Sequence, residues 1–97
     1  MKLLSFSPRA ETEIDTIWDY SASHWGSDQA DAYTDAIRDT CRDLASGMRR
    51  GRGSNIRGGF LKCPCGSHVI WFRATDDRLD IIRILHGMQD VERHLHD

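Results

Sequence analysis

The sequence predicts an α+β fold, with an N-terminal strand and a helical hairpin packed on an antiparallel β-sheet of three to four strands. In the first half of the chain, apolar residues recur at three- and four-residue spacing over two long segments. In the second half, three short strand-like runs are separated by turn-like breaks. Helical segments followed by a run of strands are typical of this class. Because 97 residues have room for one core, we expect a single domain over 1–97.

The first elements are a short strand and a helix. Residues 2–6 form an apolar run that we expect to be extended. Ser7 and Pro8 follow as a helix start, since a hydroxyl can cap free backbone amides and proline fits the first helical position. Apolar residues then recur between Ala10 and Trp25, with acids between them, which predicts an amphipathic helix that ends at Gly26.

A second amphipathic helix is predicted to begin at Ser27 or Asp28 and to end near Gly47. Its apolar stripe consists of Ala30, Tyr33, Ile37, Cys41 and Leu44. The link at Gly26 and Ser27 is so short that the two helices must fold back on each other as a hairpin.

The second half of the chain begins with a basic loop. Residues 47–59 contain five glycines and four arginines without periodicity. Strand-like runs follow over 60–63, 68–75 and 79–86, and short breaks between them predict an antiparallel meander. The third run is nearly continuously apolar, which indicates a central strand covered by the helices. Residues 88–94 could add one or two helical turns.

Charge divides the chain into two regions. Residues 10–43 carry nine acids against two bases, whereas residues 44–75 carry six Lys and Arg and no acid. A basic middle region favours a partner that offers negative charge, either an acidic protein segment or a phosphate backbone.

The expected location is the cytoplasm. No signal peptide is visible, because the apolar run at the start is short and is followed at once by Pro8 and charged residues. No stretch approaches the roughly 18 apolar residues that a bilayer requires, so we expect no membrane contact. An odd number of cysteines favours free thiols in a reducing compartment; they are Cys41, Cys63 and Cys65.

Cys63 and Cys65 flank a proline and could ligate zinc, with His68 nearby. A closed zinc site needs four ligands, commonly with a C-x₂₋₄-C spacing, and a fourth ligand is not evident. We therefore expect two cysteines at a strand end, no metal and no cofactor.

The histidines were considered as a possible general base. His68 opens one strand and His86 closes the next, so the two should meet at one end of an antiparallel sheet. Such a pair could do acid–base work on RNA or could hydrogen-bond the backbone. No nucleophile accompanied by a recognisable base is present, so we expect no catalytic residues. An enzymatic alternative would rest on His68, Arg73, Arg83 and His86.

Five short motifs then occur in order along nearly the whole chain. They span residues 7–10, 17–20, 24–26, 66–73 and 82–87, the last followed by Asp90. Together they resemble the ParE toxins of the ParE/RelE toxin–antitoxin superfamily. The departures from the family pattern are the Gly/Arg-rich loop and the Cys63-Pro64-Cys65 sequence.

The resemblance implies a toxin that inhibits DNA gyrase by binding and stabilises cleaved DNA, so that it meets nucleic acid only indirectly. It also implies a ParD-type antitoxin, whose C-terminal segment wraps the toxin in a hetero-oligomeric complex. The RelE branch of the superfamily instead implies ribosome-dependent mRNA cleavage, through basic residues on the sheet and a Tyr or His near the C-terminus. That branch fits poorly, because no tyrosine follows Tyr33 and Lys62 is the only lysine beyond Lys2. A third possibility is a diverged member that only binds its antitoxin and represses its operon.

The contact surface for target or antitoxin is expected to combine the basic loop with the C-terminal segment. An amphipathic antitoxin segment would place its acids against these arginines. Arg83 alternates in phase with Leu79 and Leu85, so it could instead be buried and paired with an acid. The expected contact residues are Arg49, Arg50, Arg52, Arg57, Arg83, Asp90 and Arg93.

Overall fold

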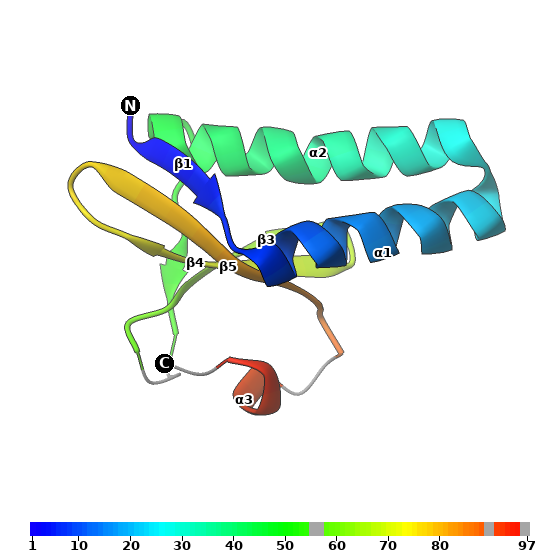
Figure 1. Cartoon of the computed structure of the whole chain (residues 1–97). Coiled ribbons are helices and arrows are strands. Elements are labelled where there is room, and N and C mark those ends of the chain that lie inside the picture. The colour runs from blue at the N-terminus through cyan, green and yellow to red at the C-terminus, as the bar shows by residue number, and fades with distance from the viewer. Residues whose placement is uncertain (55–57, 89–90, 96–97) are drawn as a thin grey trace.

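The computed structural model of the chain describes residues 1–54, 58–88 and 91–95, without the side chains of residues 91 and 92. Two long helices lie across one face of a sheet, and a short helix lies on the other side (Figure 1). This arrangement confirms the predicted α+β class. The elements are β1 (Leu3–Phe6), α1 (Pro8–Trp25), α2 (Ser27–Ser46), β2 (Arg52–Gly53), β3 (Leu61–Cys65), β4 (His68–Ala74), β5 (Arg78–His86) and α3 (Val91–His94).

The sheet has five strands in the order β1-β5-β4-β3-β2, rather than the three to four expected. Strands β3, β4 and β5 form the predicted antiparallel meander. Strand β2 lies within the predicted basic loop, where Arg52 pairs with Lys62 and Gly53 with Leu61. Two residues are too few to leave an alternating pattern in the sequence, which is why this strand was missed.

The first strand makes the sheet mixed rather than antiparallel throughout. Strand β1 runs parallel to β5, with Leu3 opposite Arg78 and Phe6 opposite Ile81. A parallel partner far along the chain cannot be recognised from a local pattern, because it needs a long crossover. Here the helical hairpin and strands β2, β3 and β4 lie between the two strands along the chain.

The helical hairpin is built as the sequence predicts. The Ser7 side chain accepts a hydrogen bond from the Ala10 amide at 3.0 Å and donates one to the Ile82 carbonyl at 2.5 Å, which ties the start of α1 to β5. Gly26 alone separates the two helices, with φ = 92°. Glycine adopts this left-handed region without the penalty that a side chain adds. Helix α2 ends at Gly47, which is also left-handed.

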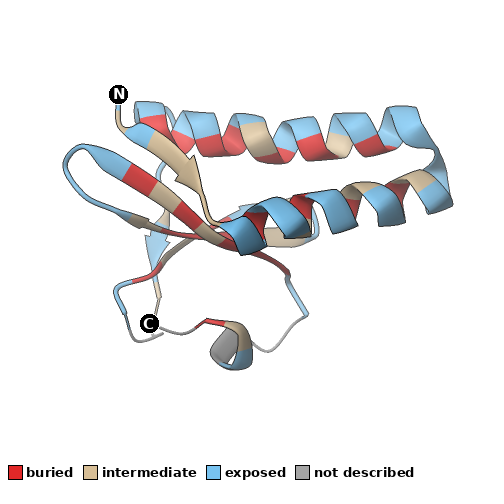
Figure 2. Ribbon diagram, in the orientation of Figure 1, coloured by how far each residue is buried: buried red, intermediate tan, exposed pale blue. Residues whose placement is uncertain are grey.

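The main core lies between the hairpin and the sheet. Figure 2 shows buried residues along the sides of α1 and α2 that face the strands, and exposed residues on their outer sides. Each large aliphatic side chain buried there stabilises the fold by about 1.5–3 kcal/mol. The core includes Ala10, Ile14, Ile17, Ile37, Cys41, Leu44, Ile70, Phe72, Leu79, Ile81 and Ile84.

A second, smaller core lies on the opposite face of the sheet. It contains Phe60, Trp71, Leu85 and Leu95, so the C-terminal segment covers part of this face. None of the helices within the described residues is long and apolar enough to cross a membrane.

Candidate functional site

The hairpin extends beyond the sheet at the turn between α1 and α2 (Figure 1). An open hollow of about 510 Å³ lies between this part of the hairpin and the sheet. Helices α1 and α2 provide its walls, while the β3–β4 turn and the ends of β4 and β5 provide its floor. Apolar surface predominates in the hollow, and no Lys or Arg is among its described lining residues. The side chains that define it are Ile17, Tyr20, Trp25, Tyr33, His68 and His86.

The floor of the hollow carries a hydrogen-bonded cluster. His68 and His86 are paired across β4 and β5, as the sequence predicts, with ring centroids 5.4 Å apart and rings nearly perpendicular. The Tyr33 hydroxyl lies 2.7 Å from Nδ1 of His68 and accepts the Ser67 amide at 2.9 Å. Nδ1 of His86 accepts the Met88 amide at 3.1 Å. Nδ1 of each histidine is therefore engaged in a hydrogen bond, with Tyr33 for His68 and with Met88 for His86.

The pKa of His68 lies below its usual value of 6.5. Burial of the ring is the main cause and the neighbouring His86 adds to it, whereas Glu13 acts in the opposite direction. His68 is therefore neutral at neutral pH. Since the Tyr33 oxygen already accepts the Ser67 amide, its proton is available for Nδ1, and this pattern favours the tautomer with hydrogen on Nε2.

Tyr33 was missed as a site residue, because its position in an apolar helical stripe indicates a core side chain. The turn of β3–β4 lies directly against it. At Gly66, where φ is 59°, a Cβ would come within 2.7 Å of the Tyr33 hydroxyl oxygen. The signal that could have identified Tyr33 is its hydroxyl, because a buried tyrosine usually finds a hydrogen-bond partner.

Exposed aromatic residues form the rim of the hollow at the end of α1. Tyr20 stacks on His24 with ring centroids 4.0 Å apart, and Trp25 lies edge-on to Tyr20 at 6.0 Å. Tyr20 is 58% exposed and Trp25 is 64% exposed. Large aromatic side chains that remain exposed beside an apolar hollow are typical of protein-binding surfaces.

Arg83 is buried and paired with an acid, as expected, although a bulge in the pairing of β4 with β5 places it on the opposite side of the sheet from Leu79 and Ile81. It is 8% exposed, and its Nε and Nη2 donate to Oε2 of Glu13 at 2.9 and 2.6 Å. Oε1 of Glu13 accepts the Ile84 amide at 2.8 Å, while Nη1 of Arg83 donates to the His94 carbonyl at 2.6 Å. Arg83 thus connects α1, β5 and the C-terminal segment and does not present its charge to a partner.

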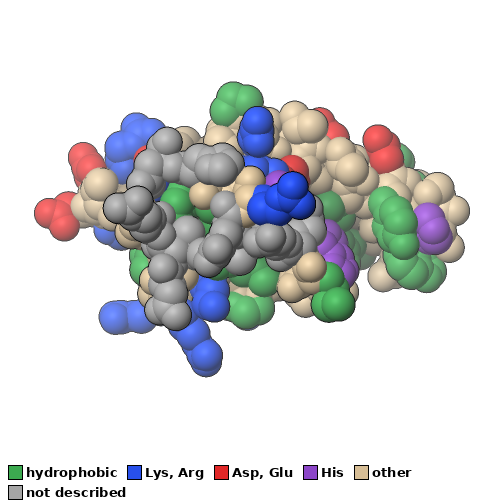
Figure 3. Space-filling view, turned by 90° about the horizontal axis from the view of Figure 1, so that it is seen from below, with side chains coloured by type: hydrophobic (Ala, Val, Ile, Leu, Met, Phe, Trp, Pro, Cys, Tyr) green, Lys and Arg blue, Asp and Glu red, His purple; other side chains and the backbone are tan. Residues whose placement is uncertain are grey.

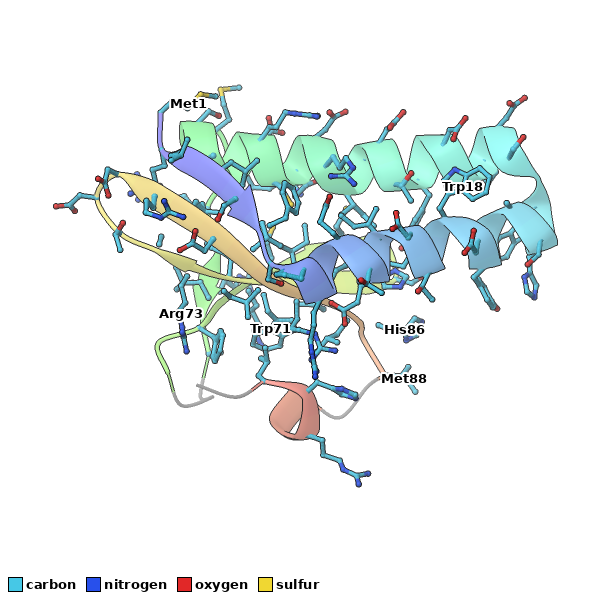
Figure 4. All side chains as sticks on the ribbon, in the orientation of Figure 1. Met1, Trp18, Trp71, Arg73, His86 and Met88 are labelled. Carbon is cyan, nitrogen blue, oxygen red and sulfur yellow. The ribbon has the colours of Figure 1, made fainter. Side chains whose placement is uncertain are left out.

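The four residues of the enzymatic alternative are not brought together. His68 and His86 line the hollow on the hairpin side of the sheet. Arg73 lies on the opposite face over the Phe60 ring, 4.3 Å from its centroid. Arg83 is paired with Glu13. Figure 4 shows Arg73 and His86 at opposite ends of the sheet. The histidine pair therefore lacks the arginines that would hold a phosphate beside it.

Some of the expected basic contact residues are exposed at the surface. Arg49, Arg50 and Arg52 are exposed, and so is Arg93 on α3. Figure 3 shows Lys and Arg side chains on the face of the molecule opposite the hairpin, with acidic side chains nearer its edges. The remaining two expected contacts, Arg57 and Asp90, lie outside the described residues.

The cysteines lie between the hairpin and the sheet. Cys41 and Cys63 are buried and Cys65 is half-buried, all as free thiols. Burial raises the pKa of Cys41 to about 12, and the two neighbouring thiols add to the shift. Within the described residues, no three His, Cys, Asp or Glu side chains are placed to hold a metal ion.

Comparisons with known proteins agree on one family. The family described as "ParE toxin of type II toxin-antitoxin system, parDE" matches residues 4–91. Toxin ParE1 of Caulobacter vibrioides is 36% identical over 96 residues, which cover 98% of this chain and 99% of that protein. Toxin ParE1 of Mycobacterium tuberculosis is 36% identical over 91 residues, covering 92% and 93%.

A solved structure agrees on the fold. It is described as a chromosomal ParDE toxin–antitoxin system from P. aeruginosa and superimposes with a TM-score of 0.77. The match covers 89% of this chain and 96% of that chain at 21% sequence identity.

Proposed function

This chain belongs to the ParE toxin family of type II toxin–antitoxin systems, and from that premise we propose that it stops growth by binding DNA gyrase. The observation that favours binding over catalysis is the separation of His68 and His86 from Arg73 and Arg83. A phosphodiester cleavage site needs its proton-transfer groups and its cations around one reacting atom. Gyrase works on the chromosome, so the proposed site of action is the cytoplasm.

A ParD-type antitoxin is the proposed neutralising partner, in a hetero-oligomeric complex. Two surfaces support this proposal. The apolar hollow with its Tyr20 and Trp25 rim can receive the apolar side of an amphipathic segment, since buried aromatic anchors provide most of the affinity at such interfaces. Arg49 and Arg50 can meet acids of the same segment and accelerate its association.

The proposed contacts with gyrase or antitoxin are made by the exposed arginines, whereas Arg83 has a different role. Arg49, Arg50, Arg52 and Arg93 are surface candidates, and Arg57 and Asp90 remain proposals on the sequence alone. Arg83 acts as a positioning residue, because it holds the C-terminal segment through the His94 carbonyl.

A ribosome-dependent endoribonuclease is the second candidate function. The specific observation in its favour is the His68–His86 pair, with the Tyr33 hydroxyl beside it and a lowered pKa at His68. A neutral imidazole can accept a proton as a general base, although no Lys or Arg is among the described lining residues of the hollow.

Induction of the chain in bacteria, with and without the neighbouring antitoxin gene, tests these candidates. We expect growth arrest and an SOS response with intact mRNA, and recovery when the antitoxin gene is co-expressed. His86→Ala should remain toxic, while His24→Ala serves as a matched histidine control outside the floor of the hollow. Discrete codon-linked mRNA cuts that disappear in His86→Ala would favour the endoribonuclease, and normal growth would favour a repressor without toxicity.

A further inference from the structure

The charge division in the sequence becomes a division between layers of the fold. The nine acids of residues 10–43 belong to the two helices on one side of the sheet. Basic residues of the acid-free region lie on the opposite face of the sheet, Arg73 among them. Because Leu61 points into the main core, its neighbour Lys62 points away from the hairpin, and its strand partner Arg52 does the same. We refer to Arg52 and Lys62 as the basic row.

The basic row is continuous with the second core. Lys62 is the strand partner of Trp71, and its ammonium lies 5.8 Å from the centroid of the Trp71 ring. Neighbouring strands are about 4.8 Å apart, so the backbone positions of Arg52 and Lys62 are neighbours across β2 and β3. Neither Arg52 nor Lys62 makes an ion pair with the described residues.

Asp80, the acid that β5 places on this face, is already paired. Asp80 lies across from Arg73 and is held by Arg78 at 3.0 Å and by the Ser5 hydroxyl. These two hydrogen bonds keep the pKa of Asp80 below its usual value. Asp80 is therefore not left to neutralise Arg52 or Lys62.

The burial of the aromatic residues indicates which kind of polyanion this face can bind. Trp71 is 4% exposed and Phe60 is 1% exposed, beneath Leu95 and the Arg73 guanidinium. Proteins that bind single strands stack bases on exposed aromatic rings, and the two rings here are covered. A charged face without a stacking surface suits the phosphate backbone of a duplex.

We propose that the basic row binds the phosphate backbone of duplex DNA without sequence preference. In a gyrase–DNA complex, this contact adds to the protein–protein contact and directs the face opposite the hairpin toward the DNA, while the acidic hairpin faces away. The role of this contact in a gyrase–DNA complex rests on the proposed function, but its test uses DNA alone. The two can therefore fail independently: a chain that inhibits gyrase without binding DNA contradicts only this inference.

The test is binding of the full chain to a labelled duplex of random sequence and about 20 base pairs, followed by fluorescence anisotropy over a range of salt concentrations. Two phosphate contacts predict a slope of log K against log [salt] of about −1.8, because each contact contributes about −0.9. Affinity should then fall about tenfold between 50 and 200 mM salt. Arg52→Ala and Lys62→Ala should each make the slope shallower by about 0.9, and Arg52→Lys should restore it.

Arg42→Ala is the matched control. It makes the same change in net charge, but Arg42 lies on the hairpin in an exposed pair with Asp39. Its slope and affinity should equal those of the unchanged chain. An equal loss in Arg42→Ala, tighter binding to single-stranded RNA than to the duplex, or a loss of antitoxin binding alone in Arg52→Ala would each overturn the proposal. Circular dichroism of every variant, with Arg52→Lys as the charge-preserving form, separates lost binding from lost folding.

Discussion

The two faces of the sheet are stabilised in different ways. The hairpin face is covered by two helices whose apolar stripes extend along most of their length, and the residues described in its core carry no charge. The opposite face is covered in part by a short C-terminal segment, through Leu95 and one hydrogen bond from Arg83. Stability on the first face therefore comes from burial of many side chains, whereas the second depends on a few residues around one ion pair.

The largest expected effect follows from removing one partner of that ion pair and leaving the other. Arg83→Ala leaves the Glu13 carboxylate without its partner, at a side chain that is 19% exposed. Loss of one partner of a buried pair typically lowers the free energy of unfolding by about 3–5 kcal/mol. Urea denaturation followed by circular dichroism measures this change.

The control is the double variant Glu13→Gln with Arg83→Met, which removes both charges and keeps similar volumes. It should recover much of the loss, because no uncompensated charge remains. A change below about 1 kcal/mol in Arg83→Ala would mean that the pair is exposed to solvent and that the C-terminal segment is held otherwise.

The next effect compares the two cores directly. Ile70→Ala on the hairpin face removes a fully buried side chain and should cost about 2–5 kcal/mol. Leu95→Ala on the other face should cost less, about 1–3 kcal/mol, because a segment near the chain end can relax around the change. Denaturant midpoints of both variants give the comparison, and an equal or larger loss for Leu95→Ala would show that the second core is the more cooperative one.

A smaller effect is expected at the floor of the hollow. Tyr33→Phe removes the hydroxyl that serves both the Ser67 amide and Nδ1 of His68. The expected loss of stability is about 1–3 kcal/mol, because polar groups in part-buried positions lose a partner. Tyr20→Phe is the matched control, since Tyr20 is 58% exposed and should change stability by less than about 0.5 kcal/mol.

The smallest effect is a pH dependence carried by His68. Its pKa is lowered in the folded state, so below about pH 6.5 the unfolded chain binds more protons than the folded one. The contribution to stability is complete above that pH and declines as the pH falls from about 6.5 toward the folded pKa. His68→Gln should flatten the pH dependence of unfolding in this range. In His86→Ala, NMR titration should find the pKa of His68 raised, and an unchanged value would contradict the assigned cause.

Most of the fold could be predicted from periodicity and glycine positions. Apolar spacing and the cap residues Ser7, Gly26 and Gly47 predict both helices, because those signals are local. The parallel pairing of β1 with β5 and the two-residue β2 could not be predicted in this way, since long-range pairing leaves no trace in a short window.

The candidate site was predicted in part. The meeting of His68 with His86 follows from their positions at matching strand ends. Arg83 is buried as its phase with Leu79 suggested, but a bulge shifts that phase, so Arg83 faces the second core while Leu79 faces the hairpin. The hydrogen-bond partners of His68 and Arg83 could not be predicted from the sequence. Tyr33 is 35 residues from His68, and Glu13 is 70 residues from Arg83. Such contacts depend on how the hairpin lies over the sheet, which the sequence pattern of one element does not specify.

The most direct test of toxicity by binding is a supercoiling assay with purified DNA gyrase, ATP and relaxed plasmid. At micromolar concentration, the chain should inhibit supercoiling and accumulate cleaved plasmid. Equimolar ParD-type antitoxin should restore supercoiling, and His86→Ala should inhibit as well as the unchanged chain. Unaffected supercoiling, combined with mRNA cleavage on purified ribosomes, would contradict the account.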